Sequence, residues 1–377
     1  MTLLSMVGED ITRIVPLLFA YKNTIKHHVL LCDDAPSNYE RARTLKEGMT
    51  KFSKKNGLKW EIQIVSIDED SAHDIAGVAK KYFTDAQDIW LNATDGYPAM
   101  TVLLSDFVRQ KGGKVLSYDH FDNDLHIIDA EGHMTAEKLS ARMDIESYLT
   151  LLNYSIVTER KKEHIFSRKE AVMTLFKDFS RFKKIKDRLV YPETSTADLH
   201  YFTDLLDALE VLGIVDKDHQ FIASEKKMLE GDLLEEYVFW LCESLNPDDI
   251  SVSIEIEFVD SKTEPDIIKR VNNEFDVLLM HKNRLFTIEC KNRKNLVGLD
   301  EIYKYDAIID YFGHASKAIL VNVSNVYKEK YIGMHKSKNF SHSTLRRARL
   351  AGVHVYHETQ INVIKFQNLV QNFFHLS

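Results

Sequence analysis

Residues 273–293, NEFDVLLMHKNRLFTIECKNR, set acids and a lysine within an otherwise apolar pattern. Asp276 interrupts a run of Phe, Val and Leu, and Glu289 stands two positions before Lys291. The pattern predicts two antiparallel strands joined by a turn at 281–284. A loop of two or four residues within this turn places Asp276 directly opposite Glu289, with their Cβ atoms about 5 Å apart.

Two carboxylates at that spacing repel each other unless a positive charge lies between them. A divalent cation such as Mg²⁺ or Mn²⁺ prefers oxygen ligands and would relieve the repulsion, and the carbonyl of Cys290 offers one more oxygen. Because strand side chains alternate between faces, Lys291 shares a face with Glu289. A metal ion, a water and a lysine are the apparatus of phosphodiester hydrolysis. The alternative is a ladder of salt bridges on a solvent-facing sheet.

The elements that must position this hairpin begin at residue 226. A helix there carries Glu235 and Glu236 among apolar residues. Apolar periodicity predicts further helices and strands, with helices at 226–245, 299–313 and 341–352 and strands at 251–259, 317–323 and 353–357. We therefore expect a second α/β domain with a mixed sheet over residues 226–377.

The first 140 residues alternate short apolar runs with helical patterns. Strands are predicted at 3–8, 27–34, 60–68, 88–96, 114–120 and 124–129, and helices at 10–23, 38–57, 72–83 and 98–112. Such β–α alternation predicts a parallel, doubly wound sheet covered on both faces. Ligands of these sheets bind at the carboxyl ends of the strands.

Residues 141–225 are predicted to be mostly helical. The segment 161–190 is basic and amphipathic, and 198–224 predicts a helix, a glycine stop and a short hairpin, as in a small winged-helix-like module. We interpret this part as a connector with a solvated basic face. Direct contact of the module with nucleic acid is the alternative.

Two strand ends of the first domain have features of ligand-binding turns. In SMVGED (5–10) a glycine allows close approach of the backbone, and the helix that follows offers free amides to an anion. NATDGYPAM (92–100) has Asn92, Thr94 and Gly96 as polar turn elements, and Pro98 suits a first helical turn. Each is equally compatible with a plain strand-to-helix turn. Neither contains the GxGxxG fingerprint of dinucleotide binding.

Composition narrows the classes of partner. The chain has 377 residues with 49 basic and 57 acidic side chains, a formal net charge of −8. It therefore attracts polyanions only through local basic patches or metal ions. Three scattered cysteines predict reduced thiols and a cytoplasmic location. We expect no secretory signal and no membrane contact, because no apolar run reaches the roughly 18 residues of a transmembrane helix.

Asp276 followed by Glu289-x-Lys291, with an acid on the preceding helix, resembles the PD-(D/E)xK nucleases of the restriction-endonuclease-like fold. The flanking segments GDLLEEYV and LDEIYKYDAI strengthen the similarity. Phe275 stands where the family usually has proline.

This resemblance implies a metal-dependent nuclease. Asp276 and Glu289 would be metal ligands together with Glu235, the helix-borne acid, for which Glu236 is the alternative. Lys291 would be the catalytic lysine. Contacts to nucleic acid are expected from Lys304 and from the arginines of LRRARLAG, which are Arg346, Arg347 and Arg349; a solvated helix face is the other interpretation of these arginines.

The whole chain resembles the CARF (CRISPR-associated Rossmann fold) nucleases of type III CRISPR defence: a Rossmann-like sensor (1–140), a connector (141–225) and a nuclease domain (226–377). The fourth-strand loop of that family often reads N-x-T-G-G-T-K. Asn92, Thr94 and Gly96 match it, whereas Asp95, Tyr97 and Pro98 depart from it. An acid at position 95 disfavours a nearby phosphate, and the aromatic ring of Tyr97 suits stacking on adenine.

The resemblance implies binding of a cyclic oligoadenylate, with cyclic tetra-adenylate favoured, by residues of the two turns: Val7, Gly8, Glu9, Asp10, Asn92, Thr94, Asp95, Gly96, Tyr97, Pro98 and Met100. It also implies a homodimer with one ligand across the two-fold axis and cleavage of DNA, RNA or both with Mn²⁺ or Mg²⁺. Two alternatives stay open: a non-catalytic, ligand-responsive nucleic-acid-binding regulator and a constitutive nuclease.

Overall fold

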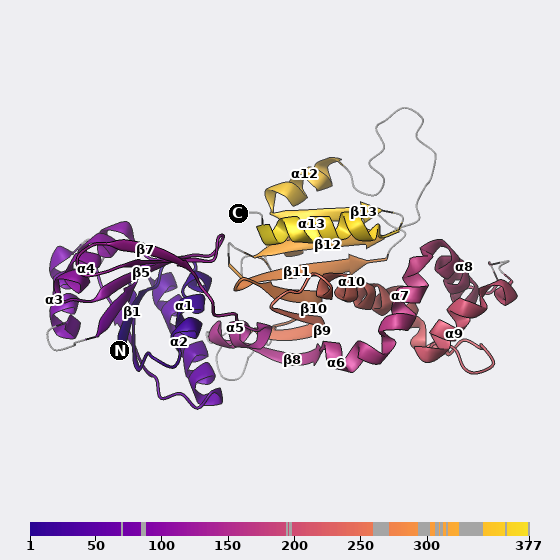
Figure 1. Ribbon diagram of the computed structural model, residues 1–377, viewed down its shortest axis with the longest axis horizontal. Coiled ribbons are helices and arrows are strands. Elements are labelled where there is room, and N and C mark those ends of the chain that lie inside the picture. Colours follow the sequence, from indigo (N-terminus) through magenta and orange to yellow (C-terminus); the bar gives the residue numbers. More distant parts are fainter. Residues whose placement is uncertain are drawn as a thin grey trace.

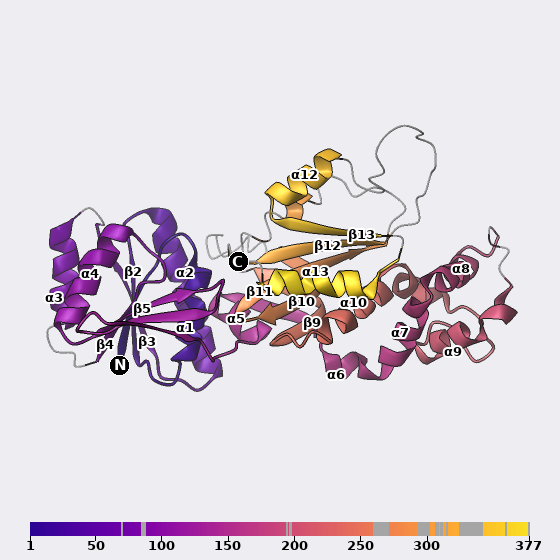
Figure 2. The same cartoon turned by 45° about the horizontal axis from the view of Figure 1, so that its top comes forward.

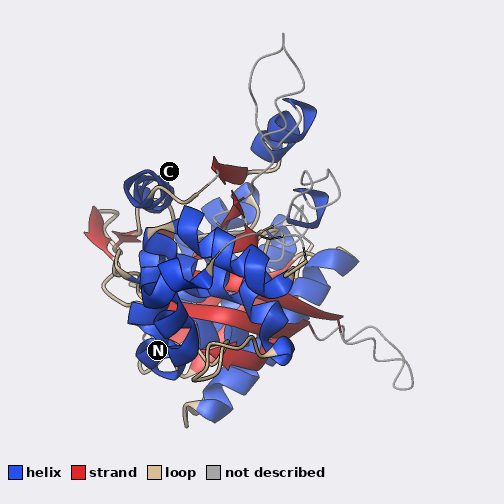
Figure 3. Cartoon of the chain, turned by 90° about the vertical axis from the view of Figure 1, so that its right-hand side faces the viewer, coloured by secondary structure: helices blue, strands red, loops and turns tan. Residues whose placement is uncertain are grey.

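The computed structural model describes residues 1–68, 71–83, 88–193, 195, 198–258, 271–292, 302–305, 309, 312–313, 316–323, 342–358 and 360–375. Two sheets and a helical module follow one another along the long axis of the molecule (Figures 1 and 2). Figure 3 shows the helices and strands as they lie when the molecule is viewed along that axis. No helix in these ranges is long and apolar enough to cross a membrane.

The first sheet has the order β3-β2-β1-β4-β5-β6-β7. Its strands are β1 (Thr2–Met6), β2 (His27–Cys32), β3 (Glu61–Ser66), β4 (Ile89–Asn92), β5 (Lys114–Asp119), β6 (Asp124–Ile128) and β7 (Met134–Lys138). The five strands β1 to β5 are parallel, as predicted, but β6 and β7 are antiparallel additions. The turns before β6 and β7 are too short for the crossover that parallel pairing requires.

Helices cover both faces of this sheet, which confirms the doubly wound architecture. They are α1 (Val15–Ala20), α2 (Pro36–Lys55), α3 (Ala72–Phe83) and α4 (Pro98–Gln110). In α2 and α4, proline occupies the first helical turn, where its missing N–H costs nothing. Strand β1 lies between β2 and β4. The chain extends the sheet on one side of β1 through β2 and β3 and on the other side through β4 and β5, so the topological switch point is at the carboxyl ends of β1 and β4.

The second sheet has the order β13-β12-β11-β10-β9-β8. Its strands are β8 (Tyr154–Arg160), β9 (Asp249–Phe258), β10 (Val271–His281), β11 (Arg284–Lys291), β12 (Lys317–Val323) and β13 (Val353–Glu358). Strands β8 to β11 pair antiparallel and β11 to β13 pair parallel, so the sheet is mixed, as predicted. The edge strand β8 lies within 141–225, where the sequence predicts a mostly helical connector. That segment therefore contributes to the second sheet as well.

Helices α10 (Leu233–Glu243), α12 (His342–Leu350) and α13 (Val363–His375) pack around this sheet, and residues 302–305 are also helical. A π-helical turn at Met228–Asp232 leads directly into α10. Such turns are rare and often occur at functional sites.

The connector contains α5 (Ile145–Leu151), α6 (Lys162–Ile165), α7 (Lys169–Lys177), α8 (Phe179–Val190) and α9 (Thr203–Val211). The basic, amphipathic segment 161–190 forms α6, α7 and α8, and the carboxylate of Asp178, between α7 and α8, caps α8 by accepting from the N–H of Arg181. After α9, Gly213 has φ +72°, and Val215 bridges Phe221 in an antiparallel pair. The predicted order of helix, glycine stop and short hairpin is thus confirmed.

The two sheets share a hydrophobic core. Leu125 and Met143 belong to the same buried cluster as Leu278, Met280 and Leu285 of β10 and β11. Two loops also meet, because a Cβ built on Gly313 would lie 1.9 Å from Oγ1 of Thr12. The amino-terminal domain therefore packs directly against the domain that carries the hairpin.

Candidate active site

The β10–β11 hairpin has the loop length and register predicted from the sequence. His281 pairs with Arg284, so the loop has two residues, and both have positive φ (50° and 59°), as a type I′ turn requires. The same register, continued one position beyond the last pair, sets Asp276 opposite Glu289.

Asp276 is bonded across the hairpin to β11, and Lys291 is bonded along β11 to Glu289. The N–H of Cys290 donates to Oδ2 of Asp276 at 2.6 Å. Glu289 is buried and forms an ion pair with the ammonium group of Lys291. A contact between residues two apart needs both side chains on one face of the strand, as the sequence predicts.

The two acids at the start of α10 have different surroundings. Glu236 is fully buried and accepts from Arg160 and Arg168, both at 3.0 Å. Glu235 instead accepts from Oγ of Ser253 at 2.8 Å, and its charge acts on Asp276 of the hairpin. Glu235 is therefore the helix acid that faces the hairpin, whereas Glu236 joins α10 to the connector.

Ser253 lies at an irregularity that the sequence pattern does not reveal. Its φ is +49°, in the left-handed region, and the β9–β10 pairing skips the position where Ser253 would face Asp276. Val252 packs in the core with α10, whereas Ile254 packs in the core shared with the amino-terminal domain. The strand changes the core it faces at this serine. Arg160 donates to its Oγ at 2.6 Å and helps to fix the side chain.

Burial and like charge raise the pKa of two of these carboxyls. Burial raises the pKa of Asp276 to about 8, with further increases from Glu289 and Glu235. Burial also raises the pKa of Glu235 to about 7, although the hydroxyl of Ser253 works in the opposite direction. Because Glu289 and Glu235 both disfavour the ionisation of Asp276, a cation bound between these acids would stabilise the charged form of Asp276.

Asp276, Glu289 and Glu235, here called the acid cluster, fit a hard divalent cation because all three offer carboxylate oxygens. Cys290 does not add a thiolate, since burial raises the pKa of its thiol well above the usual value. The role of its carbonyl oxygen as a ligand stays a prediction, as do the catalytic roles of the three acids and Lys291.

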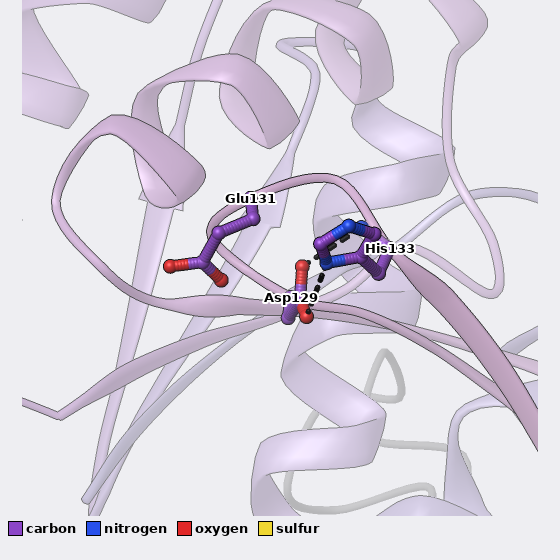
Figure 4. Close-up of side chains that lie close together, drawn as sticks. All are labelled: Asp129, Glu131 and His133. Carbon is purple, nitrogen blue, oxygen red and sulfur yellow. Dashed lines mark hydrogen bonds and ion pairs between the residues drawn. The ribbon is translucent and has the colours of Figure 1, made fainter.

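In the described ranges, two other groups of acids and histidines have possible ligand atoms within 4.8 Å of one another, which the acid cluster does not. Asp129, Glu131 and His133 lie at the β6–β7 turn (Figure 4), where Nδ1 of His133 is 3.4 Å from Asp129. Asp207, Glu210 and His219 form the second group. Both groups are largely solvent-exposed and lack any further feature of a binding site, so we assign them no function.

The basic residues predicted to contact nucleic acid are exposed. Lys304 and Arg346 extend into solvent, and the guanidinium of Arg347 lies 5.6 Å from the ring centroid of Tyr303. This contact joins α12 to the helical segment 302–305. Arg349 on the same helix is also exposed. Contact of these residues with nucleic acid stays a prediction.

The two candidate ligand turns of the first domain meet through Asp95. Its carboxylate accepts from the N–H of Gly8 at 2.8 Å and of Asp10 at 3.3 Å. A Cβ on Gly8 would lie 2.8 Å from the main-chain nitrogen of Gly96, and one on Gly96 would lie 2.6 Å from Cβ of Met6. Both glycines are thus needed for this close packing. Asp95 is a clamp between the turns, and burial raises its pKa.

Several predicted ligand residues are buried. Asn92 accepts from the hydroxyl of Thr94 at 2.6 Å, and Val7 and Met100 pack in the core. The side chains of Val7 and Met100 are therefore not available to a ligand at this edge. Glu9 and Pro98 are exposed.

A third strand end, absent from the sequence prediction, completes this edge. Asn38 at the start of α2 donates to both oxygens of Asp33 at 2.9 Å and to the hydroxyl of Tyr97 at 2.7 Å. The sequence did contain a signal for this contribution, namely the acidic pair Asp33-Asp34 directly after strand β2. The carboxyl ends of neighbouring parallel strands meet at one edge, so these acids could have been placed beside the two candidate turns. Stacking of Tyr97 on a base stays a prediction.

The fold and the site define a two-domain architecture: a Rossmann-like domain joined through a helical connector to a domain whose mixed sheet carries the acid cluster. Residues 223–337 match the family model described as Card1-like, endonuclease domain. No curated relative matches the sequence.

Solved structures share the architecture over the whole chain. Can2 from Sulfobacillus thermosulfidooxidans, solved in complex with cyclic tetra-adenylate, has a TM-score of 0.69 and 16% identity, with 99% of each chain covered. Protein VC1899 from Vibrio cholerae has a TM-score of 0.69 and 15% identity over 100% of this chain and 97% of its own. A type III CRISPR defence DNA nuclease activated by cyclic oligoadenylate has a TM-score of 0.53 and 15% identity, over 94% of this chain and 50% of its own. The resemblance predicted from the sequence is confirmed.

Proposed function

We propose that this protein is a nuclease of type III CRISPR defence that a cyclic oligoadenylate activates. The observation that carries the proposal is the acid cluster with Lys291, which lies within the stretch that matches an endonuclease domain. Its finer parts, namely dependence on Mn²⁺ or Mg²⁺ and cleavage of DNA, RNA or both with little sequence preference, rest on the chemistry of the residues. Three buried, free cysteines accord with the expected cytoplasmic location.

In the proposed site, Asp276, Glu289 and Glu235 would hold the cation, which would supply charge stabilisation and activate water when bound. Lys291, whose ammonium group is paired with Glu289, would orient the attacking water and face the charge that develops on the phosphate. Ser253 fixes the carboxylate of Glu235. Exposed Lys304, Arg346 and Arg347 are proposed to contact the nucleic-acid backbone.

In the amino-terminal domain, we propose that the activator is cyclic tetra-adenylate, bound at the carboxyl edge of β1 and β4. The likeness to the cyclic-tetra-adenylate complex of Can2 supports this ligand. The edge is at the topological switch point, where ligands of such sheets bind. A symmetric ligand suits a homodimer formed through these domains, which sedimentation of the protein with and without the ligand would test.

The experiment is cleavage of plasmid, single-stranded DNA and RNA with Mn²⁺, against a panel of cyclic oligoadenylates. We expect cleavage that requires both the ligand and the ion, with Glu289→Ala and Lys291→Ala at least about 100-fold slower but with unchanged ligand binding. Glu358→Ala, which breaks an ion pair with Lys365 in the same domain, is the matched control and should retain activity. Wild-type rates in the two site variants would exclude the assigned site.

Two alternatives give different results in the same assay. A non-catalytic regulator would bind nucleic acid tightly without any cleavage that EDTA abolishes. A constitutive nuclease would cleave at the same rate with and without the cyclic nucleotide.

A further inference from the structure

The turn of the acid-bearing hairpin is buried in the amino-terminal domain. The side-chain amide of Asn283 donates to Oδ1 of Asn123 at 3.1 Å and to the carbonyl of Ala141 at 3.0 Å. Its Oδ1 accepts from the N–H of Met143 at 2.9 Å. Asn283 is only 4% exposed, so these bonds replace all of its contacts with water. A single side chain thus holds the turn to Asn123 of the amino-terminal domain and to the main chain of Ala141 and Met143, just after that domain.

The same turn is bonded to the strand beside the candidate ligand loop. The hydroxyl of Tyr118 on β5 donates to Asn123 at 3.0 Å and to the carbonyl of Lys282 at 3.4 Å. The main-chain N–H of Tyr118 donates to Oγ1 of Thr94 at 3.0 Å. Thr94, a predicted ligand residue, is therefore linked to the hairpin turn by two hydrogen bonds through a single residue, Tyr118.

The hairpin joins this turn to the acid cluster. Asp276 lies six positions before Lys282, and Glu289 lies six positions after Asn283, which corresponds to about 20 Å of strand. The ladder between the strands fixes their relative register. A displacement of the turn therefore moves both carboxylates together, whereas Glu235 is held separately on α10.

We propose that Asn283 is a positioning residue through which the amino-terminal domain, via Thr94 and Tyr118, sets the pose of Asp276 and Glu289 relative to Glu235. The inference rests on the proposed function and names the contact by which ligand binding regulates that site. In this proposal, ligand binding changes the conformation of the loop after β4, which displaces Tyr118 on β5. Tyr118 in turn displaces the hairpin turn through its contacts with the carbonyl of Lys282 and with Asn123, to which Asn283 is bonded.

Asparagine suits this position for two reasons. It tolerates the left-handed backbone (φ +59°) that the turn requires, and its amide offers two donors and one acceptor to the three partners. Asn283→Gly keeps the backbone conformation and removes every side-chain bond. Asn283→Asp keeps the shape of the side chain but replaces the NH₂ group, which donates to the oxygens of Asn123 and Ala141, with an oxygen that can only accept. Lys282→Asn is the matched control, since Lys282 contributes its carbonyl and is also in the left-handed region.

The test uses the full-length protein with cyclic tetra-adenylate as the probe. The cleavage rates with and without ligand, the ligand dissociation constant and the hydrogen exchange of peptides covering 276–291 are measured for each variant. We expect Asn283→Gly and Asn283→Asp to reduce the ligand-to-basal rate ratio about tenfold or more, with a dissociation constant for the ligand within about threefold of wild type. Ligand-dependent exchange in 276–291 should be lost in parallel, and Lys282→Asn should behave as wild type.

Tyr118→Phe adds a second variant that keeps the buried ring. It should lower the ratio in the same direction, and its combination with Asn283→Gly should be less than additive, because both act through one turn. If folded Asn283 variants have the wild-type ligand-to-basal cleavage ratio and the wild-type exchange response in 276–291, this inference is wrong, but the proposed function still stands. A wild-type protein that neither binds nor responds to any cyclic oligoadenylate would overturn the proposed function, and this inference with it.

Discussion

At the scale of single residues, burial and charge separate two acids that are adjacent in sequence. Glu236 is neutralised by two arginines, whereas Glu235 meets a serine hydroxyl and other carboxylates. A buried ion pair is costly to break, but an acid held among like charges is costly to keep ionised. Position within the helix therefore decides which acid is structural and which is available for chemistry.

Substitution of each acid by glutamine tests this division. Glu236→Gln leaves Arg160 and Arg168 without their carboxylate and should lower the free energy of unfolding by about 3–5 kcal/mol. Glu235→Gln should leave that free energy unchanged or raise it, and should abolish metal-dependent cleavage. Urea unfolding and cleavage assays of both variants give the comparison. A stable, inactive Glu236→Gln with an active Glu235→Gln would reverse the assignment.

The raised pKa of Asp276 predicts how stability depends on pH in the absence of metal. Between its unfolded pKa near 4 and its folded pKa of about 8, the unfolded chain loses its proton first, so stability should fall as pH rises through this range. Since one pKa unit corresponds to about 1.4 kcal/mol, the change is on the order of a few kcal/mol.

Thermal unfolding with EDTA from pH 5 to 8 measures this slope, and Asp276→Asn should flatten it. Mn²⁺ should raise the unfolding temperature of the wild type more at pH 8 than at pH 5, and should have little effect on Asp276→Asn. An equal slope in the two proteins would show that Asp276 is not the group responsible.

At the scale of elements, the hairpin works only in one register. Its two-residue turn sets Asp276 opposite Glu289, and β9 and β10 both change the core they face beside Ser253. A strand that switches cores in this way carries its polar residue between two apolar surfaces. This is how an acid is accommodated within an otherwise apolar strand.

Insertion of one glycine after Asn283 should therefore inactivate the site. A shift of one position moves side chains to the opposite face, so the carboxylate pair is lost. Cleavage should fall at least about 100-fold, and stability should fall by about 2 kcal/mol or more as the buried strands lose their register. The same insertion after Lys217, in the exposed hairpin of the connector, is the control and should be tolerated. Full activity after the insertion at Asn283 would exclude the register argument.

At the scale of the whole molecule, the two domains meet through a shared core and through close loop contacts. Gly313 faces Thr12 and Asp10 of the first domain, and the hydroxyl of Tyr148 donates to the carbonyl of Phe312 at 2.9 Å. Gly313 has φ +86°, a conformation that side chains rarely adopt. The contact adjoins one of the two candidate ligand turns.

Gly313→Ala should disturb this interface, because the added methyl would overlap Oγ1 of Thr12. We expect a loss of about 1–3 kcal/mol in stability and weaker binding of the cyclic nucleotide, measured by calorimetry. Gly77→Ala, where nothing lies within 4 Å, is the control and should be neutral or slightly stabilising. Wild-type affinity in a folded Gly313→Ala would show that the interface does not reach the ligand turn.

The sequence by itself determined the features that depend on local pattern. Apolar periodicity predicted the strands and helices of both domains, and the turn chemistry of the hairpin predicted the register of Asp276 and Glu289, because both depend on neighbours within a few residues. The same pattern predicted that Lys291 shares a face with Glu289.

Only the tertiary structure decided the features that join distant segments. It assigned Glu235 to the acid cluster and Glu236 to two arginines of the connector. It also added β8 to the second sheet and brought Asp33 and Asn38 to the candidate ligand edge. It also placed the hairpin turn inside the other domain. These outcomes depend on packing between segments far apart in the chain, where local periodicity carries no information about which surfaces meet.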